Sequence, residues 1–363
     1  MPRPDAIVLP EVKTVDIRID SVQTIIHSMV LMVKSEDLSG LNPWIYETVS
    51  KLTPEQKATH DLVLIGLHYS VLPTRLWKDF PTYLAELETT DPLALRNRIL
   101  DFYLAYECCK SAEKKIQATR EELLANVDFF LEFLENRFGE ESVDPEIEQK
   151  AFYLLNEPEK MKKLITSHLG FLWKEYFQAE WERVTPMLND AVLAFEKIDF
   201  SGMSREEAAK YITGQDLSPD SWDLNSDEIN QLIFIPSAHN GPYLGRFQYK
   251  NALGVIFGAR LPKDTEMHAP DLSRNEITIR LSALADDVRL NILKVIAESG
   301  ELRSQEIMDR LDLSQSATSR NLKQLSATGY LVERRCSGAK CYSLDAERVQ
   351  DTMRAVEAFL LCD

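Results

Sequence analysis

The sequence predicts a two-domain α+β protein that is mostly helical. Its 363 residues are about twice the usual length of one domain. Helix-start signals recur over the first part of the chain, and the later segments QLIFIPS, YLGRFQYK and ALGVIFGAR are typical of β-strands separated by turns. A polar linker, placed at residues 263–271, then separates an N-terminal domain, residues 1–262, from a C-terminal domain, residues 272–363.

The N-terminal domain is expected to be a helical body that carries a small antiparallel sheet. Apolar and polar residues alternate in Val12–Ile19, so this segment predicts a strand that is a candidate to join the sheet. Capping boxes begin at Thr53 and Ser204, and two Asp-Pro pairs each place a cap before a proline at the first helical position. With the apolar spacing, these signals predict helices near residues 21–33, 54–69, 92–117, 120–138, 145–155 and 159–199, the last broken or kinked at Pro186.

Composition and motif content argue against a secreted protein, a membrane protein and an enzyme. The apolar runs are too short to cross a bilayer or to form a signal peptide, so we expect a cytoplasmic protein without membrane contact. Five cysteines at irregular spacing do not form a disulfide framework. The sequence contains no His-Glu-x-x-His, Gly-x-Ser-x-Gly or glycine-rich phosphate loop, so no catalytic site, cofactor or metal is expected.

Charge is distributed unevenly along this acidic chain. The net charge is −17, but residues 271–363 carry thirteen Lys and Arg against fifteen Asp and Glu. Within residues 314–342 the balance reverses to five bases, among them Lys323, against one acid, Glu333. An acidic body with one basic edge favours contact with DNA at that edge and repels phosphate elsewhere.

The C-terminal domain contains two short helices joined by a tight turn. Ser304 caps the first of these helices, Asp312 and Leu313 form the turn, and Ser314 caps the second, which closes at Gly329. This arrangement is the sequence form of a helix-turn-helix. A module used for contact with another protein is the alternative, and the local basic balance favours DNA.

The spacing of the second short helix decides which side chains meet DNA. Thr318, Leu322 and Leu325 recur at helical spacing and are expected to face the core. The same helix then exposes candidate base readers, in which Gln suits adenine, Arg suits guanine, and short side chains allow a close approach. Ser314 leaves backbone N–H groups for a phosphate. The outward set is Gln315, Ser316, Ser319 and Arg320.

The stretch YLVERRCSGAKCYSL predicts two strands around a Ser-Gly-Ala-Lys turn, which together form a wing. Arg334, Arg335 and Lys340 are candidate phosphate contacts on this wing, although each also fits an ordinary solvated strand position. Cys336 and Cys341 are expected to lie directly opposite each other. They are a candidate redox pair, while two reduced thiols that pack as small apolar groups are the favoured alternative.

The final helix, ERVQDTMRAVEAFLL, carries an apolar stripe that its own domain does not require. Together with apolar residues of the first C-terminal helix, this stripe predicts contact with a second copy of the chain. The predicted dimer surface comprises Ile277, Leu281, Val349, Met353, Val356 and Leu360.

The run LSALADDVRLNILKVIAESGELRSQEIMDRLDLSQSATSRNLKQLSATGYLVERR resembles the ArsR/SmtB-type bacterial repressors, and the likeness covers about a quarter of the chain. The resemblance implies a dimeric winged helix-turn-helix that binds an inverted-repeat operator in double-stranded DNA and releases it when an effector binds. It places the recognition contacts at Ser314, Gln315, Ser316, Ala317, Ser319 and Arg320.

This sequence departs from the metal-sensing members of that family. Their Glu-Leu-Cys-x-Cys pattern is replaced here by residues 301–305, ELRSQ, so both thiols are absent and a metal sensor is not expected. The upstream segment LIFIPSAHNGPYL resembles part of an uncharacterised domain found ahead of such modules. We therefore expect a transcriptional repressor whose N-terminal domain senses an unknown small molecule. The alternative is an N-terminal domain that serves oligomerisation or protein contact and binds no ligand.

Overall fold

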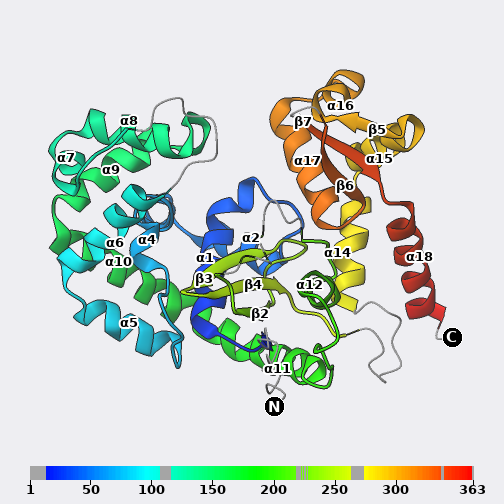
Figure 1. The fold of residues 1–363 in the computed structure, drawn as a ribbon, viewed down its shortest axis with the longest axis horizontal. Helices are drawn as coiled ribbons and strands as arrows, with labels where there is room; N and C mark the ends of the chain where they lie inside the picture. Colours follow the sequence, from blue (N-terminus) through cyan, green and yellow to red (C-terminus); the bar gives the residue numbers. More distant parts are fainter. Residues whose placement is uncertain are drawn as a thin grey trace, which may run out of the picture. The chain divides into compact units, whose positions relative to one another are not determined.

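The computed structural model describes residues 14–106, 116–217, 222, 224, 226, 228–262, 274–336 and 339–361. The chain forms two compact units, one of residues Asp20–Pro186 and one that joins Met1–Ile19 to Met187–Asp363. Figure 1 labels the elements of both. The linker expected at residues 263–271 lies outside the described residues, and the expected boundary at residue 262 stays a prediction.

The unit Asp20–Pro186 is built from helices, several of which begin at the caps that the sequence indicated. Thr53, for example, caps α3 through a reciprocal capping box with Gln56. The α-helices are α1 Ser21–Val33, α2 Pro43–Lys51, α3 Pro54–Asp61, α4 His68–Val71, α5 Phe80–Thr89, α6 Pro92–Ala105, α7 Arg120–Ala125, α8 Val127–Phe138, α9 Pro145–Leu155, α10 Pro158–Leu172 and the first part of α11 Gln178–Phe195. Short 3-10 turns lie at Lys34–Glu36 and Glu140–Ser142, and π turns lie at Leu62–Gly66 and Trp173–Phe177.

Three helix predictions differ from the structure. Asn126 divides the expected helix 120–138, because its side chain accepts the N–H of Phe129 and caps α8. Helix α11 continues through Pro186, so the break expected there is wrong, while the kink given as its alternative stays a prediction; an irregular turn lies at Trp173–Phe177. Helix α6 ends at Ala105, and the rest of the expected helix 92–117 falls largely on residues outside the described part. Helices α2 and α5 were not predicted.

Two histidines that are far apart in the sequence form a buried hydrogen-bonded pair. Nδ1 of His60 lies 3.0 Å from Nε2 of His168, and Nε2 of His60 lies 2.9 Å from the carbonyl oxygen of Met29. A carbonyl only accepts, so His60 donates from Nε2 and accepts from His168 at Nδ1. Burial lowers the pKa of His60 to about 4 and that of His168 to about 3, so both are neutral at pH 7.

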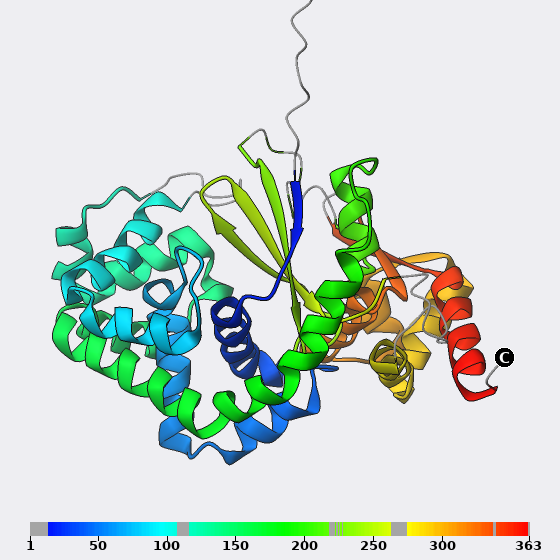
Figure 2. The ribbon, with the colours of Figure 1, turned by 90° about the horizontal axis from the view of Figure 1, so that it is seen from below.

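The second unit contains a four-stranded sheet with the order β1-β2-β4-β3. Its strands are β1 Thr14–Ile17, β2 Gln231–Ser237, β3 Gly245–Tyr249 and β4 Ala252–Gly258. The strand expected at Val12–Ile19 does join the sheet, and Figure 2 shows it in blue beside the yellow-green strands. Helix α12, Arg205–Thr213, begins at the predicted Ser204 capping box.

The expectation that this sheet is antiparallel is wrong. Strand β2 pairs in parallel with both β1 and β4, and only β3 and β4 pair antiparallel. Strands β2 and β4 are almost entirely buried, which is why their sequences are continuous apolar runs instead of alternating ones. Phe195 of α11 and Ile212 of α12 pack against side chains of these strands in one core.

The C-terminal part of this unit has the predicted winged helix architecture, with antiparallel strands in the order β5-β7-β6. Its core gathers apolar side chains from every helix except α18, with Val349 of α18 packed at the edge. The mostly helical α+β class is thereby confirmed. The elements are α14 Arg274–Leu284, α15 Asp287–Ser299, β5 Glu301–Arg303, α16 Ser304–Leu311, α17 Gln315–Ala327, β6 Leu331–Cys336, β7 Ala339–Leu344 and α18 Ala346–Leu361.

No helix in the described part of the chain combines the length and the apolar character that a bilayer span requires.

Glu148 in α9 is a buried carboxyl whose cost to stability depends on pH. Burial, with a smaller contribution from the negative charge of Asp144, raises the pKa of Glu148 from 4.5 to about 7. Its Oε2 atom is buried without a hydrogen bond to any described group. Below pH 4.5 the folded and unfolded chains both hold this proton, so the cost is absent. The loss of stability grows as the pH rises above 4.5 and reaches its full size above about pH 7.

We therefore expect Glu148→Gln to stabilise the protein at pH 8, by up to about 3 kcal/mol for a shift of this size. The gain should shrink towards zero as the pH is lowered to 4.5. Calorimetric unfolding of the variant and the wild type at pH 8 and pH 5 measures it. Glu146→Gln is the matched control, since Glu146 lies in the same first turn of α9 but is exposed. An equal gain at both pH values would contradict this account.

Candidate nucleic-acid interface

The turn between α16 and α17 has the conformation that a helix-turn-helix requires. Asp312 ends α16 in the left-handed region, with φ of 52°, and its N–H donates to the carbonyl of Met308. Short polar residues such as Asp tolerate this conformation because their side chains bond locally. Ser314 then caps α17 by accepting the N–H of Ala317 at 3.3 Å. The predicted turn and the cap at Ser314 are both confirmed, whereas the N-cap of α16 is Arg303 and not Ser304 as expected.

The two faces of α17 are those that the helical spacing predicted. Thr318, Leu322 and Leu325 are buried in the core of the module. The opposite face holds no acidic side chain, so it is polar and basic only. Its members are Ser314, Gln315, Ser316, Ser319, Arg320 and Lys323, all exposed, with Ala317 half-buried.

Carboxylates neutralise two of the three bases on the wing. Nη2 of Arg334 lies 2.5 Å from Oε2 of Glu301, and a second hydrogen bond joins Nε to Oε1 of the same carboxylate. Lys340 forms an ion pair of 2.7 Å with Glu333. Glu301 belongs to β5, outside the stretch in which the sequence shows a basic excess, so the first pairing was not predicted.

Arg335 differs from its two neighbours on the wing. Its side chain is exposed and forms no ion pair with another residue that the structure describes. The same holds for Arg320 and Lys323 on α17. These three bases, on two elements of one module, are exposed and form no ion pair with a described carboxylate.

The two wing cysteines are not directly opposite each other, and that expectation is wrong. Cys336 pairs with Ala339, and Cys341 pairs with Arg334. The pairing of Cys336 with Ala339 leaves residues 337–338 as the connection between the strands, in place of the Ser-Gly-Ala-Lys turn expected from the sequence, and these two residues lie outside the described part. Cys341 is a buried free thiol. The backbone therefore gives no support to a redox pair.

The apolar residues of α14 and α18 divide into an inner and an outer group. Ile277 is buried against Ala355 and Val356, and Val349 packs on the core of the module. These contacts occupy part of the predicted dimer surface within a single copy. The outer group remains exposed and comprises Leu281, Met353 and Leu360, together with Phe359 and Leu361, which were not predicted.

The comparisons with known proteins concern this module. A family model described as "Bacterial regulatory protein, arsR family" matches residues 286–332, from the cap of α15 into β6. The chain is similar to the arsenic resistance transcriptional regulator ArsR1 of Pseudomonas putida, with 41% identity over 69 residues, which are 19% of this chain and 54% of that protein. The chain thus spans about half the length of this curated relative.

A solved structure, the crystal structure of NolR from Sinorhizobium fredii, is 31% identical over 23% of this chain and 82% of that chain, with a TM-score of 0.20. The family match and the helix-turn-helix geometry coincide on the same residues. The C-terminal module of this chain, through residues 286–332, is a helix-turn-helix of the bacterial arsR family.

Proposed function

We propose that this protein is a sequence-specific DNA-binding transcriptional regulator whose exposed α17 face enters the major groove. The observation that carries the proposal is this face itself: it combines Gln315, Arg320 and Lys323 with short side chains and holds no acid. The arsR family match to the same residues supports it. Gln and Arg pair with adenine and guanine edges, and short Ser and Ala side chains permit a close backbone approach.

Bases outside the recognition helix hold the phosphate backbone in this proposal. Arg335 is available at once, because no described carboxylate binds it. Arg334 and Lys340 contribute after exchanging their carboxylate partners for phosphate, which costs little because exposed ion pairs are weak. The N-terminus of α17 at Ser314 offers further backbone donors.

The regulator acts as a homodimer on an inverted repeat in this proposal. The exposed apolar side chains Leu281, Met353 and Leu360 favour a second copy of the module as their cover. A two-fold axis relates two α17 helices, so the operator has two half-sites about one helical turn apart. Repression follows if the dimer blocks transcription from that site.

The residues before the module act as a sensor of a small molecule or, alternatively, as a body for protein contact. The helical unit Asp20–Pro186 is a compact fold of its own, which suits either role. Ligand-dependent stabilisation separates the two, because a ligand that binds only the folded state raises the unfolding temperature.

The first prediction for DNA concerns the base readers. On an operator selected from random sequences by the wild-type protein, Gln315→Ala and Arg320→Ala should each lose about 1–3 kcal/mol of binding free energy. Binding to unrelated DNA should change much less. Fluorescence anisotropy at one fixed salt concentration measures both. Gln350→Ala and Arg354→Ala are the controls, since both residues are exposed on α18. Equal losses on operator and unrelated DNA would exclude base reading.

The second prediction concerns the wing. Arg335→Ala should weaken binding to every sequence alike and reduce the slope of log affinity against log salt by about one unit. Arg334→Ala should change the slope less, because Glu301 already offsets its charge. Glu301→Gln should raise the affinity by releasing Arg334. A slope that none of these variants alters would mean that the wing does not reach phosphate.

The third prediction concerns assembly. Met353→Asp combined with Leu360→Asp should place two charges in the dimer interface and give a monomer that keeps its fold. Operator affinity should then fall, because one recognition helix alone remains on each molecule. Sedimentation at micromolar concentration is the measurement, and Gln350→Asp on the same helix is the control. A dimer that persists in the double variant would show that the interface lies elsewhere in the chain.

A further inference from the structure

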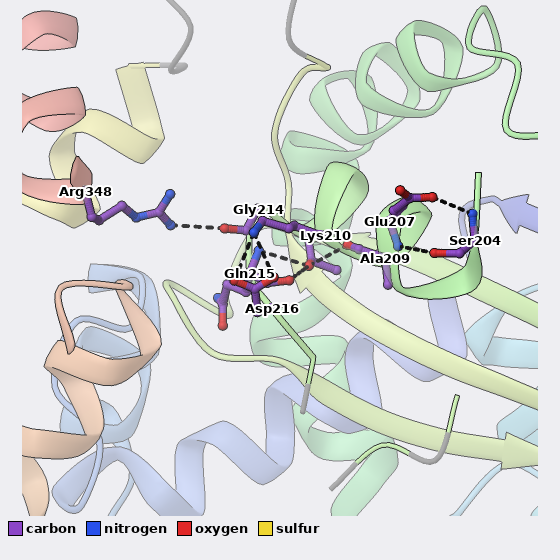
Figure 3. Close-up of polar contacts among 9 residues, drawn as sticks. Ser204, Glu207, Ala209, Lys210, Gly214, Gln215, Asp216 and Arg348 are labelled. Atoms are coloured by element: carbon purple, nitrogen blue, oxygen red, sulfur yellow. Dashed lines mark hydrogen bonds and ion pairs between the residues drawn. The ribbon is translucent and has the colours of Figure 1, made fainter. Parts of the chain in front are cut away.

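A small cavity lies inside the second unit, between the four-stranded sheet and the winged helix module. Its volume is about 50 Å³, which suits one small polyatomic group better than a nucleotide. The sheet side contributes the turn after α12 and the end of β4, and the module contributes α14, the end of α17 and the start of α18. Figure 3 shows Arg348 of α18 reaching the carbonyl oxygen of Gly214 across this junction.

Three arginines line the cavity against a single acidic residue. The arginines are Arg260, Arg280 and Arg348, and the acid is Glu276. Nε of Arg260 lies 3.2 Å from Oε1 of Glu276, and both side chains are largely buried. The group therefore carries a net charge of about +2, since arginine stays protonated at neutral pH.

Arg280 is the member without an ion-pair partner of its own, and the negative charge of Glu276 offsets only part of the effect of its burial. It is buried, with 6% of its surface exposed, and its guanidinium forms no hydrogen bond or ion pair with any residue that the structure describes. Burial, followed by the neighbouring charge of Arg348, lowers the pKa of Arg280 to about 10. A buried guanidinium that remains charged beside other cations is costly unless an anion joins it.

The other two arginines are held in place by the backbone around the cavity. Arg348 donates from Nε to the carbonyl of Thr328 at 3.0 Å and from Nη2 to that of Gly214 at 3.1 Å. Gly214 has a φ of 72°, and a Cβ there would lie 1.7 Å from Nη1 of Arg260. Glycine thus permits the close approach of Arg260. The arginines are positioned before any ligand binds, which reduces the cost of ordering them.

We propose that this cavity binds a phosphate group, either as the free ion or as the terminal group of a phosphomonoester. A phosphate monoester carries about −1.5 to −2 charges at pH 7, which matches the cluster, whereas one carboxylate would leave a cation uncompensated. Guanidinium groups also match phosphate geometry with paired N–H donors. Arg280 is the principal ligand, assisted by Arg348 and Arg260.

Phosphate bound here would connect the two sides of the cavity. Arg260 follows the sheet, while Arg280 and Arg348 belong to α14 and α18, the helices that bear the proposed dimer surface. An anion at this place would therefore link the sheet to the dimerising helices and alter operator affinity. This effect on DNA rests on the proposed function, whereas phosphate binding does not.

Thermal unfolding of the full chain tests the binding. Inorganic phosphate and glycerol 3-phosphate are titrated separately at constant ionic strength, with acetate and chloride as anion controls. The unfolding temperature of the wild type should rise with either phosphate compound and stay constant with acetate. A larger rise with glycerol 3-phosphate identifies a phosphomonoester as the source, and an equal or smaller one identifies the free ion. An equal rise with acetate, or no rise at all, overturns the proposal.

Variants connect this response to the cluster. Arg280→Met should reduce the phosphate affinity by about tenfold or more, because it removes charge-assisted hydrogen bonds. Without phosphate the same variant should unfold at a higher temperature than the wild type, since it relieves a buried, uncompensated charge, and phosphate should narrow that difference. Arg274→Gln, an exposed arginine of the same helix, is the control. A phosphate response that Arg280→Met leaves unchanged contradicts the assignment.

The DNA effect is measured separately, as operator affinity with and without phosphate. Because the unfolding assay contains no DNA, loss of phosphate binding and loss of DNA binding are recorded independently. Phosphate binding without DNA binding would support the phosphate site and contradict the proposed function. DNA binding without phosphate binding would overturn the phosphate site alone.

Discussion

The arrangement of the winged helix module depends on one buried hydroxyl group, that of Tyr330. This side chain is completely buried, and its hydroxyl lies 3.2 Å from the carbonyl oxygen of Arg280 and 3.0 Å from Oγ1 of Thr352. Its N–H donates to Leu325, and its carbonyl accepts from Asp345. Leaving such a group unbonded costs about 1–3 kcal/mol, so Tyr330 ties α14, α17 and α18 into one arrangement. That arrangement holds α17 in the module, while its helical spacing decides which of its faces is exposed.

Helices α14 and α18 also supply two of the three arginines of the cluster, Arg280 and Arg348. The carbonyl of Arg280 contacts Tyr330, while its guanidinium lines the cavity. Thr352 donates in turn to the carbonyl of Arg348, whose guanidinium crosses to Gly214. The backbone carbonyls of Arg280 and Arg348 therefore accept hydrogen bonds inside the module, whereas their guanidinium groups line the cavity. A change in charge compensation at the cavity acts on residues that also hold the recognition helix in place.

Electrostatics in this protein is local, and the net charge of the chain describes it poorly. The basic residues of α17 have no described acidic partner, whereas Arg334 on the wing is bound by Glu301 from a strand earlier in the chain. Screening confines exposed charges to a range of about 10 Å, so such neighbours decide what a phosphate group meets. The wing consequently presents less uncompensated positive charge than its sequence suggests, while the positive charges of the recognition helix have no described acidic partner.

The sequence by itself determined the features that depend on neighbours along the chain. The cap at Ser314, the turn at Asp312 and the inward face through Leu322 follow from local hydrogen bonding and helical spacing, and the structure confirms them. Only the tertiary structure decided the parallel pairing of β2, the register of Cys336, and the gathering of three distant arginines around one cavity. These features depend on contacts between residues far apart in the chain, because strand register and buried charge are set by packing that local sequence patterns do not encode.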